Sequence, residues 1–266
     1  MSKISKLGTG SSKRFVLDSV SPILLIPLLV VISSINFYLT LLVIFLVLPA
    51  LLCHIFLIFR FSLPKKKFFY VWSIVSMFFI FICFEILIVP LMVISPSENV
   101  LFYVLFCGVI FFTKRIQGNS SQNITKFGVY NKLQERKPFI GEKSSPCTGC
   151  SARGSISVSC RSCRNLMLDE NHYNAWIDCS VGESNRNNYY VLLLISMVWL
   201  AYTSYIILTT ICGSYLAFNK VLIPSDCNNV YATNRSAVCF VGVLYSVEII
   251  AFISVTLMRE FVHTAK

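Results

Sequence analysis

The sequence predicts an all-α polytopic membrane protein with six transmembrane helices and a small cysteine-rich cytosolic domain between the fourth and fifth helices. Of its 266 residues, 56% are hydrophobic and only 13% are charged, which excludes an ordinary soluble domain. Apolar runs long enough to cross a hydrocarbon core of about 30 Å occur six times. The basic residues gather in the connections of one side, as expected of a chain that crosses a membrane repeatedly.

The six spans can be placed from the apolar runs. Residues 22–59 are too many for one helix and divide near Asn36. The fourth span is short for a spanning helix. Before the first span, we find no cleavage site of small residues that would indicate a signal peptide. The expected spans are 20–36, 38–59, 68–94, 99–113, 189–211 and 236–258.

These spans divide the chain into four parts. We expect a membrane domain of four helices at 1–113, a polar cytosolic linker at 114–145, a cysteine-rich domain at 146–188, and the last two helices with a short tail at 189–266. The linker is rich in Gly, Ser, Asn and Lys, which favour irregular structure.

The orientation follows from the basic residues. All 23 Lys and Arg residues except Lys220 and Arg235 lie at the termini, in the second-to-third connection or in 114–188. Basic connections stay in the cytosol, so both termini and 114–188 are expected there. The net charge of +11 is therefore explained by topology and anionic lipid, without a nucleic-acid partner.

The cytosolic part carries a cluster of cysteines. Two Cys-x2-Cys pairs, Cys147 with Cys150 and Cys160 with Cys163, are separated by nine residues. In a reducing compartment, paired thiols at this spacing are typical ligands of a structural zinc ion rather than disulfide partners.

Residues 171–185, with the sequence NHYNAWIDCSVGESN, carry a recognisable motif. They resemble the core of the DHHC protein S-acyltransferases (palmitoyltransferases), which runs Asp-His-His-Cys-Pro-Trp, then Asn-Cys-Val-Gly and a downstream Asn. The resemblance extends over roughly 146–258. Within the family, the sequence is similar to the branch that includes the member interacting with neuronal nitric-oxide synthase. Four residues keep the motif's spacing: Trp176, Val181, Gly182 and Asn185.

The resemblance also implies that the chemistry of the family has been lost. The family's nucleophilic cysteine falls on Asn174, and a carboxamide cannot become a thiolate. The family's aspartate falls on Asn171, which cannot stabilise an imidazolium at His172 as a carboxylate would. Cys179 is expected to be a ligand or a packing residue rather than a substitute nucleophile. The chain is therefore predicted to be a pseudoenzyme with no catalytic residue.

The family's zinc sites are degenerate as well. The resemblance implies two zinc ions, each held by three cysteines and one histidine, but four of these eight positions fall on Ser159, Leu166, Tyr173 and Ser180. About one structural zinc ion is expected. It can be held by Cys147, Cys150, Cys160 and Cys163, which we favour, or by Cys160, Cys163, His172 and Cys179.

Polar residues in or beside the spans offer further candidates. Glu248 lies near the middle of the sixth span, where a carboxyl group faces a partner or a cavity, so it is a candidate for binding a client. The alternative is an internally satisfied glutamate, which we favour for Glu85. Cys212 and Cys227 lie on the non-cytosolic side, where a disulfide is one option.

The sequence thus predicts a non-catalytic escort, pilot or scaffold in the Golgi or ER membrane. Six spans with a degenerate motif resemble the insect DHHC-related Golgi pilots of a β1,4-N-acetylgalactosaminyltransferase. That resemblance implies a type II Golgi glycosyltransferase as the client, acting in glycan or glycolipid synthesis. The alternative is a protein S-palmitoyltransferase with an atypical nucleophile.

Overall fold

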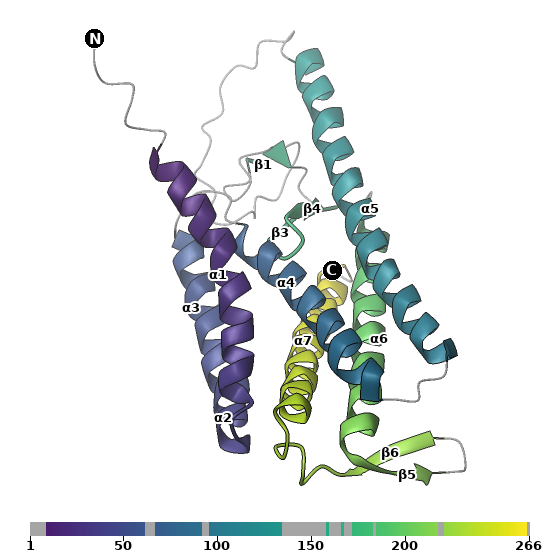
Figure 1. Ribbon diagram of the computed structural model, residues 1–266. Helices are drawn as coiled ribbons and strands as arrows, with labels where there is room; N and C mark the ends of the chain where they lie inside the picture. The colour runs from purple at the N-terminus through teal and green to yellow at the C-terminus, as the bar shows by residue number, and fades with distance from the viewer. Residues whose placement is uncertain are drawn as a thin grey trace.

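The fold is a bundle of long helices with short antiparallel hairpins toward its two ends (Figure 1). The structure, a computed structural model, describes residues 9–61, 67–91, 96–134, 158–159, 166–167, 172–182, 185–217 and 221–264.

Some helices change pitch without a break in the chain. A π-helical turn joins α2 to α3, and a π-helical turn and a 3₁₀ turn extend α4. The helical elements are α1 (Thr9–Ser33), α2 (Phe37–Leu42), η1 (Val43–Val47), α3 (Leu48–Phe61), α4 (Phe68–Cys83), η2 (Phe84–Ile88), η3 (Val89–Leu91), α5 (Pro96–Gln134), α6 (Arg186–Ile211) and α7 (Asn234–Thr264).

In the described part of the chain, the strands form three antiparallel pairs. β1 (Val158–Ser159) pairs with β2 (Leu166–Met167), β3 (His172–Asn174) with β4 (Cys179–Val181), and β5 (Gly213–Ala217) with β6 (Val221–Asp226).

Among the residues that the structure describes, five helical segments are long and apolar enough to cross a membrane: Phe37–Ile55, Phe68–Ile88, Glu98–Asn119, Arg186–Ile211 and Asn234–Val262. They match five of the predicted spans, so the chain is a mostly helical, multi-pass membrane protein. The predicted span 20–36 corresponds to α1, whose apolar part, Val20–Ser33, is shorter than the other five. A sixth crossing therefore stays a prediction.

The fourth span differs from its prediction. We expected a short helix at 99–113, but α5 runs from Pro96 to Gln134, through residues assigned to the polar linker. Once a helix is nucleated, each added residue gains a backbone hydrogen bond, so polar residues of modest helix propensity can continue it. A prediction from composition alone therefore placed the end of this helix too early.

The hydroxyl of Tyr245 fixes α7 against α4. Trp72 Nε1 donates to it at 2.9 Å, and Ser76 Oγ lies 2.5 Å from it. All three side chains are buried. Polar contacts of this kind bind helices together where the hydrophobic effect is absent, and they set the spacing of the two helices that hold the candidate site.

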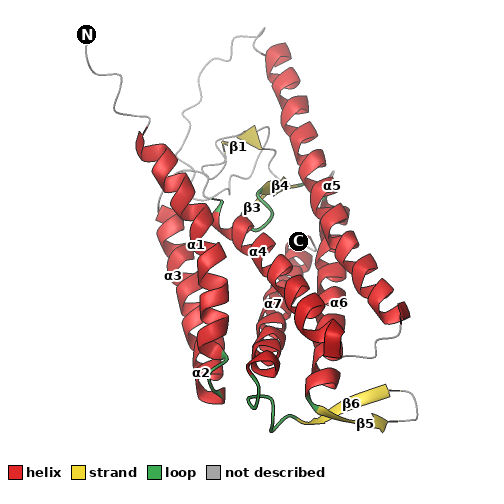
Figure 2. Cartoon of the chain, viewed as in Figure 1, coloured by secondary structure: helices red, strands yellow, loops and turns green. Residues whose placement is uncertain are grey.

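The two ends of the bundle differ. The start of α1, the β3–β4 hairpin and the end of α7 lie toward one end, and the β5–β6 hairpin lies at the other (Figure 2). At that second end Cys212 and Cys227 form a disulfide, which confirms the option raised from the sequence.

Candidate functional site

The residues that match the family's active-site motif form the β3–β4 hairpin. In its register His172 lies opposite Val181, Tyr173 opposite Ser180, and Asn174 opposite Cys179. A four-residue turn, 175–178, connects the strands. The hairpin therefore places the family's nucleophile position directly across from Cys179.

Both polar ends of the Asn174 side chain are engaged. Its Nδ2 donates to Tyr189 Oη at 2.8 Å, and its Oδ1 accepts from the backbone N–H of Trp176 at 2.9 Å. The second contact is the Asx turn that Asn side chains commonly make two residues ahead. At the position of the family's nucleophile, this chain carries a group that shapes a turn and joins it to α6.

The turn is held by an aromatic clamp. The Trp176 ring lies 4.8 Å from the ring of Phe69 in α4 and 4.9 Å from that of Phe252 in α7, measured between centroids. Such pairs each contribute about 0.5–1.5 kcal/mol beyond their buried area. Trp176 therefore joins the hairpin to two helices that are already fixed to each other.

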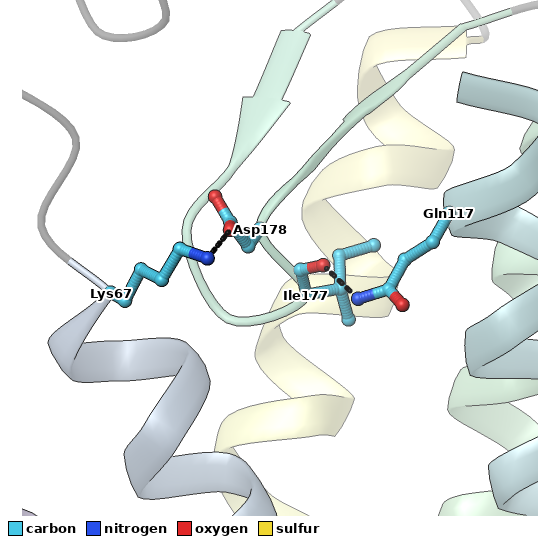
Figure 3. Close-up of polar contacts among 4 residues, drawn as sticks. All are labelled: Lys67, Gln117, Ile177 and Asp178. Atoms are coloured by element: carbon cyan, nitrogen blue, oxygen red, sulfur yellow. Dashed lines mark hydrogen bonds and ion pairs between the residues drawn. The ribbon is translucent and has the colours of Figure 1, made fainter. Parts of the chain in front are cut away.

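Two polar contacts also reach this turn (Figure 3). Lys67 Nζ lies 3.9 Å from Asp178 Oδ2, and Gln117 Nε2 donates to the carbonyl of Ile177 at 3.0 Å. Asp178 has a φ of 48°, in the left-handed region that Asp tolerates better than most residues. Lys67 at the start of α4 and Gln117 in α5 thus both contact this turn.

Asn185, the downstream asparagine of the motif, is fully buried. Its Oδ1 accepts from Gly182 N at 2.8 Å, and its Nδ2 donates to the carbonyls of Ser180 at 2.8 Å and Ile116 at 3.5 Å. It therefore joins the end of β4 and the start of α6 to α5. Its spacing in the motif was apparent from the sequence, but these partners were not.

Cys179 is buried, with 6% of its surface exposed. Burial, and secondarily the neighbouring Asp178 carboxylate, raises the pKa of its thiol to about 12. At neutral pH almost none of it is thiolate, which is the reactive form. This environment does not favour Cys179 as a substitute nucleophile.

The favoured zinc ligands, Cys147, Cys150, Cys160 and Cys163, lie outside the described residues, as does the side chain of His172. Within the described part, no three metal-binding side chains gather. The four degenerate ligand positions form two cross-strand pairs, Ser159 with Leu166 and Tyr173 with Ser180. Each hairpin has thus lost both members of a facing pair, while both Cys-x2-Cys pairs remain in the sequence.

The two intramembrane carboxyl groups share one feature. Glu85 Oε1 in η2 and Glu248 Oε2 in α7 are both buried, and neither has a hydrogen-bond partner among the described residues. The internal satisfaction that we favoured for Glu85 is therefore incomplete at that oxygen.

Comparisons with known proteins agree with the motif. Residues 141–266 match the family described as DHHC palmitoyltransferase. Palmitoyltransferase ZDHHC23 of Homo sapiens is 34% identical over 106 residues, 40% of this chain and 25% of that protein. Palmitoyltransferase ZDHHC23-A of Danio rerio is 32% identical over 88 residues, 33% of this chain and 21% of that protein.

The match thus spans about a quarter of the length of these relatives. No solved structure matches the chain. The matched segment includes the β3–β4 hairpin, α6 and α7, which hold the clamp around Trp176. Residues 141–266 thus carry a domain that matches the DHHC palmitoyltransferase family and is similar in sequence to palmitoyltransferases of that family.

Proposed function

We propose that this chain is a non-catalytic DHHC-related membrane protein that acts as an escort, pilot or scaffold for another membrane enzyme. The observation that carries the proposal is the environment of Asn174. Its carboxamide replaces the family's nucleophile, and both of its polar atoms serve the turn and α6. A residue with that role stabilises the turn of the hairpin but cannot accept an acyl group.

Two further features support the absence of acyl transfer. Asn171 stands where the family has the aspartate that orients the histidine. Cys179, directly across from Asn174, is buried, and this burial raises the pKa of its thiol. Removing the nucleophile from such a catalytic unit costs up to about 10⁶-fold in rate.

The proposed client is a type II Golgi glycosyltransferase that elongates a glycan or glycolipid. This assignment rests on the resemblance to DHHC-related pilots. The proposed location is the Golgi membrane, or the ER, with both termini in the cytosol. The distribution of basic residues supports this orientation, and so does the Cys212–Cys227 disulfide at the other end, because disulfides persist in oxidising compartments.

The proposed cofactor is one structural zinc ion. Four thiolates in two Cys-x2-Cys pairs are a donor set that zinc prefers. When bound, zinc would stabilise the cysteine-rich domain from which the β3–β4 hairpin extends. Cys147, Cys150, Cys160 and Cys163 are the proposed ligands, with His172 and Cys179 as the alternative to the first pair.

The match to this family favours one rival, a protein S-palmitoyltransferase that uses an atypical nucleophile. The rival requires an acyl-enzyme, so hydroxylamine-sensitive incorporation of a palmitate analogue into the chain separates the two functions.

The escort role is tested with a tagged β1,4-N-acetylgalactosaminyltransferase co-expressed with the chain. The transferase should co-purify with the chain from detergent-solubilised membranes and reach the Golgi only in its presence. A variant of the transferase with a foreign transmembrane helix and stem is the control for general secretory traffic. Equal Golgi location and yield without the chain would contradict the proposal.

A further inference from the structure

Helix α7 changes from buried to exposed along its length. Many residues between Ala237 and Ser246 are buried, whereas none between Val247 and Val262 is. The exposed residues include a row at helical spacing along one face, and a helix face this apolar contacts either lipid or another helix. The row consists of Val247, Ala251, Val255, Met258 and Val262.

Glu248 lies at the start of this exposed half, beside Val247. It is eleven residues before Arg259 and thirteen after Arg235. At a rise of about 1.5 Å per residue, these separations are about 16 Å and 20 Å. Glu248 is therefore close to mid-membrane, and its side chain as a whole is only half-buried.

The groups nearest to Glu248 on its own helix are already engaged. Tyr245, one turn away, is bound by Trp72 and Ser76, and Phe252, one turn the other way, lies against the Trp176 ring. Glu248 Oε2 is buried and has no hydrogen-bond partner among the described residues.

The Lys and Arg residues of the candidate spans do not pair with this carboxyl group. Within the five candidate spans, Lys and Arg occur only near the ends, at Lys114, Arg115, Arg186, Arg235 and Arg259. A charged side chain at the centre of a membrane helix is costly and is normally offset by a partner. None of the five candidate spans therefore supplies a cation at the depth of Glu248.

We propose that the row from Val247 to Val262 is a docking face for one transmembrane helix of the client. That helix would carry a lysine or another hydrogen-bond donor at mid-membrane depth, which pairs with Glu248. The apolar row supplies packing, and the carboxyl group supplies selectivity that apolar packing lacks. The inference rests on the proposed escort function and names the chemistry that the escort recognises.

The test uses the full chain in membranes, with a photo-crosslinking amino acid at Val255. The probe is a single-span type II reporter with a leucine-rich helix and one lysine at its midpoint, compared with the same helix without lysine. Polar contacts between membrane helices predict about three-fold, and at most about eighteen-fold, more crosslinking of the lysine reporter.

The variant Glu248→Leu should abolish this preference at unchanged abundance of the chain. Glu248→Gln should keep part of it, because the amide oxygen still accepts a hydrogen bond. Glu85→Leu, which removes the other intramembrane carboxyl group, is the matched control and should keep all of it. Equal crosslinking of the two reporters, or a preference that survives Glu248→Leu, would overturn the docking face.

Failure of this inference can be told from failure of the escort function. If the glycosyltransferase co-purifies normally with the Glu248→Leu chain, the docking face is wrong and the escort function stands. If the lysine preference is present but no glycosyltransferase is escorted, the docking face stands and the escort function is wrong.

Discussion

The carboxamide of Asn174 donates a 2.8 Å hydrogen bond to the hydroxyl of Tyr189, a buried residue in the first turn of α6. This contact joins the hairpin that carries the family's motif to the helix that follows it. A cysteine at the same position could not make it with the same strength, because a thiol is a weak donor. The substitution that removes the nucleophile thus supplies a structural contact.

We expect Asn174→Ala to loosen the hairpin. The variant loses both hydrogen bonds and leaves the Tyr189 hydroxyl without this donor, so it should lower the free energy of unfolding by about 1–3 kcal/mol. Tyr189→Phe removes only one of the two and should cost less. Thermal unfolding of both variants in detergent checks this order, and an Asn174→Ala protein as stable as the unchanged chain would contradict it.

The aromatic clamp makes a prediction about Cys179. Trp176→Ala removes two ring contacts worth about 1–3 kcal/mol together, so the turn should lift from α4 and α7. Cys179, now 6% exposed, should then react with maleimide much faster than in the unchanged chain.

Trp176→Phe, which keeps a ring between Phe69 and Phe252, is the matched control and should react at an intermediate rate. Mass spectrometry of the peptide that contains Cys179 measures the labelling. Equal protection of Cys179 in all three proteins would show that the clamp does not hold the turn.

The backbone of Asp178 predicts an order among its substitutions. Its φ of 48° disfavours β-branched residues, so Asp178→Val should be the most damaging change, by about 1–2 kcal/mol from the backbone alone. Asp178→Gly should relax the backbone while losing the ion pair. Lys67→Ala removes only that ion pair, which is partly exposed and worth less than about 1 kcal/mol. Thermal unfolding measures this order. A larger loss of stability in Lys67→Ala than in either Asp178 variant would contradict it.

The sequence predicted the helical class because apolar runs and basic connections are local patterns, and five of the six expected spans have candidate counterparts. It did not predict where α5 ends, because the helix continues beyond the end of the apolar run. It also missed the partners of the motif. Gln117 contacts Ile177 across 60 residues, and Asn185 contacts Ile116 across 69, distances over which no spacing rule acts.

Zinc should be structural and close to one ion per chain. Losing both facing pairs of hairpin positions leaves the two Cys-x2-Cys pairs as the favoured donor set. Structural zinc contributes on the order of 10 kcal/mol of folding free energy in small zinc peptides. Cys150→Ser should therefore lower the abundance of the chain, whereas Cys53→Ser, at an exposed position in α3, should not.

Elemental analysis of the purified protein measures the ion count directly. Two zinc ions per chain, or none, would show that the proposed ligand set is wrong. One ion that is lost in His172→Ala but kept in Cys147→Ser would favour the alternative set with Cys179.

The absence of an acyl-enzyme is the central claim, and one labelling experiment tests it most directly. The purified chain in lipid is incubated with an alkyne analogue of palmitoyl-CoA, and the acylated peptides are mapped before and after hydroxylamine. We predict no thioester-linked label within residues 146–185, either in the unchanged chain or in Asn174→Cys, since Asn171 and Tyr173 would still replace the family's aspartate and second histidine. Hydroxylamine-sensitive label in that segment of the unchanged chain, abolished by Cys179→Ala, would contradict the account.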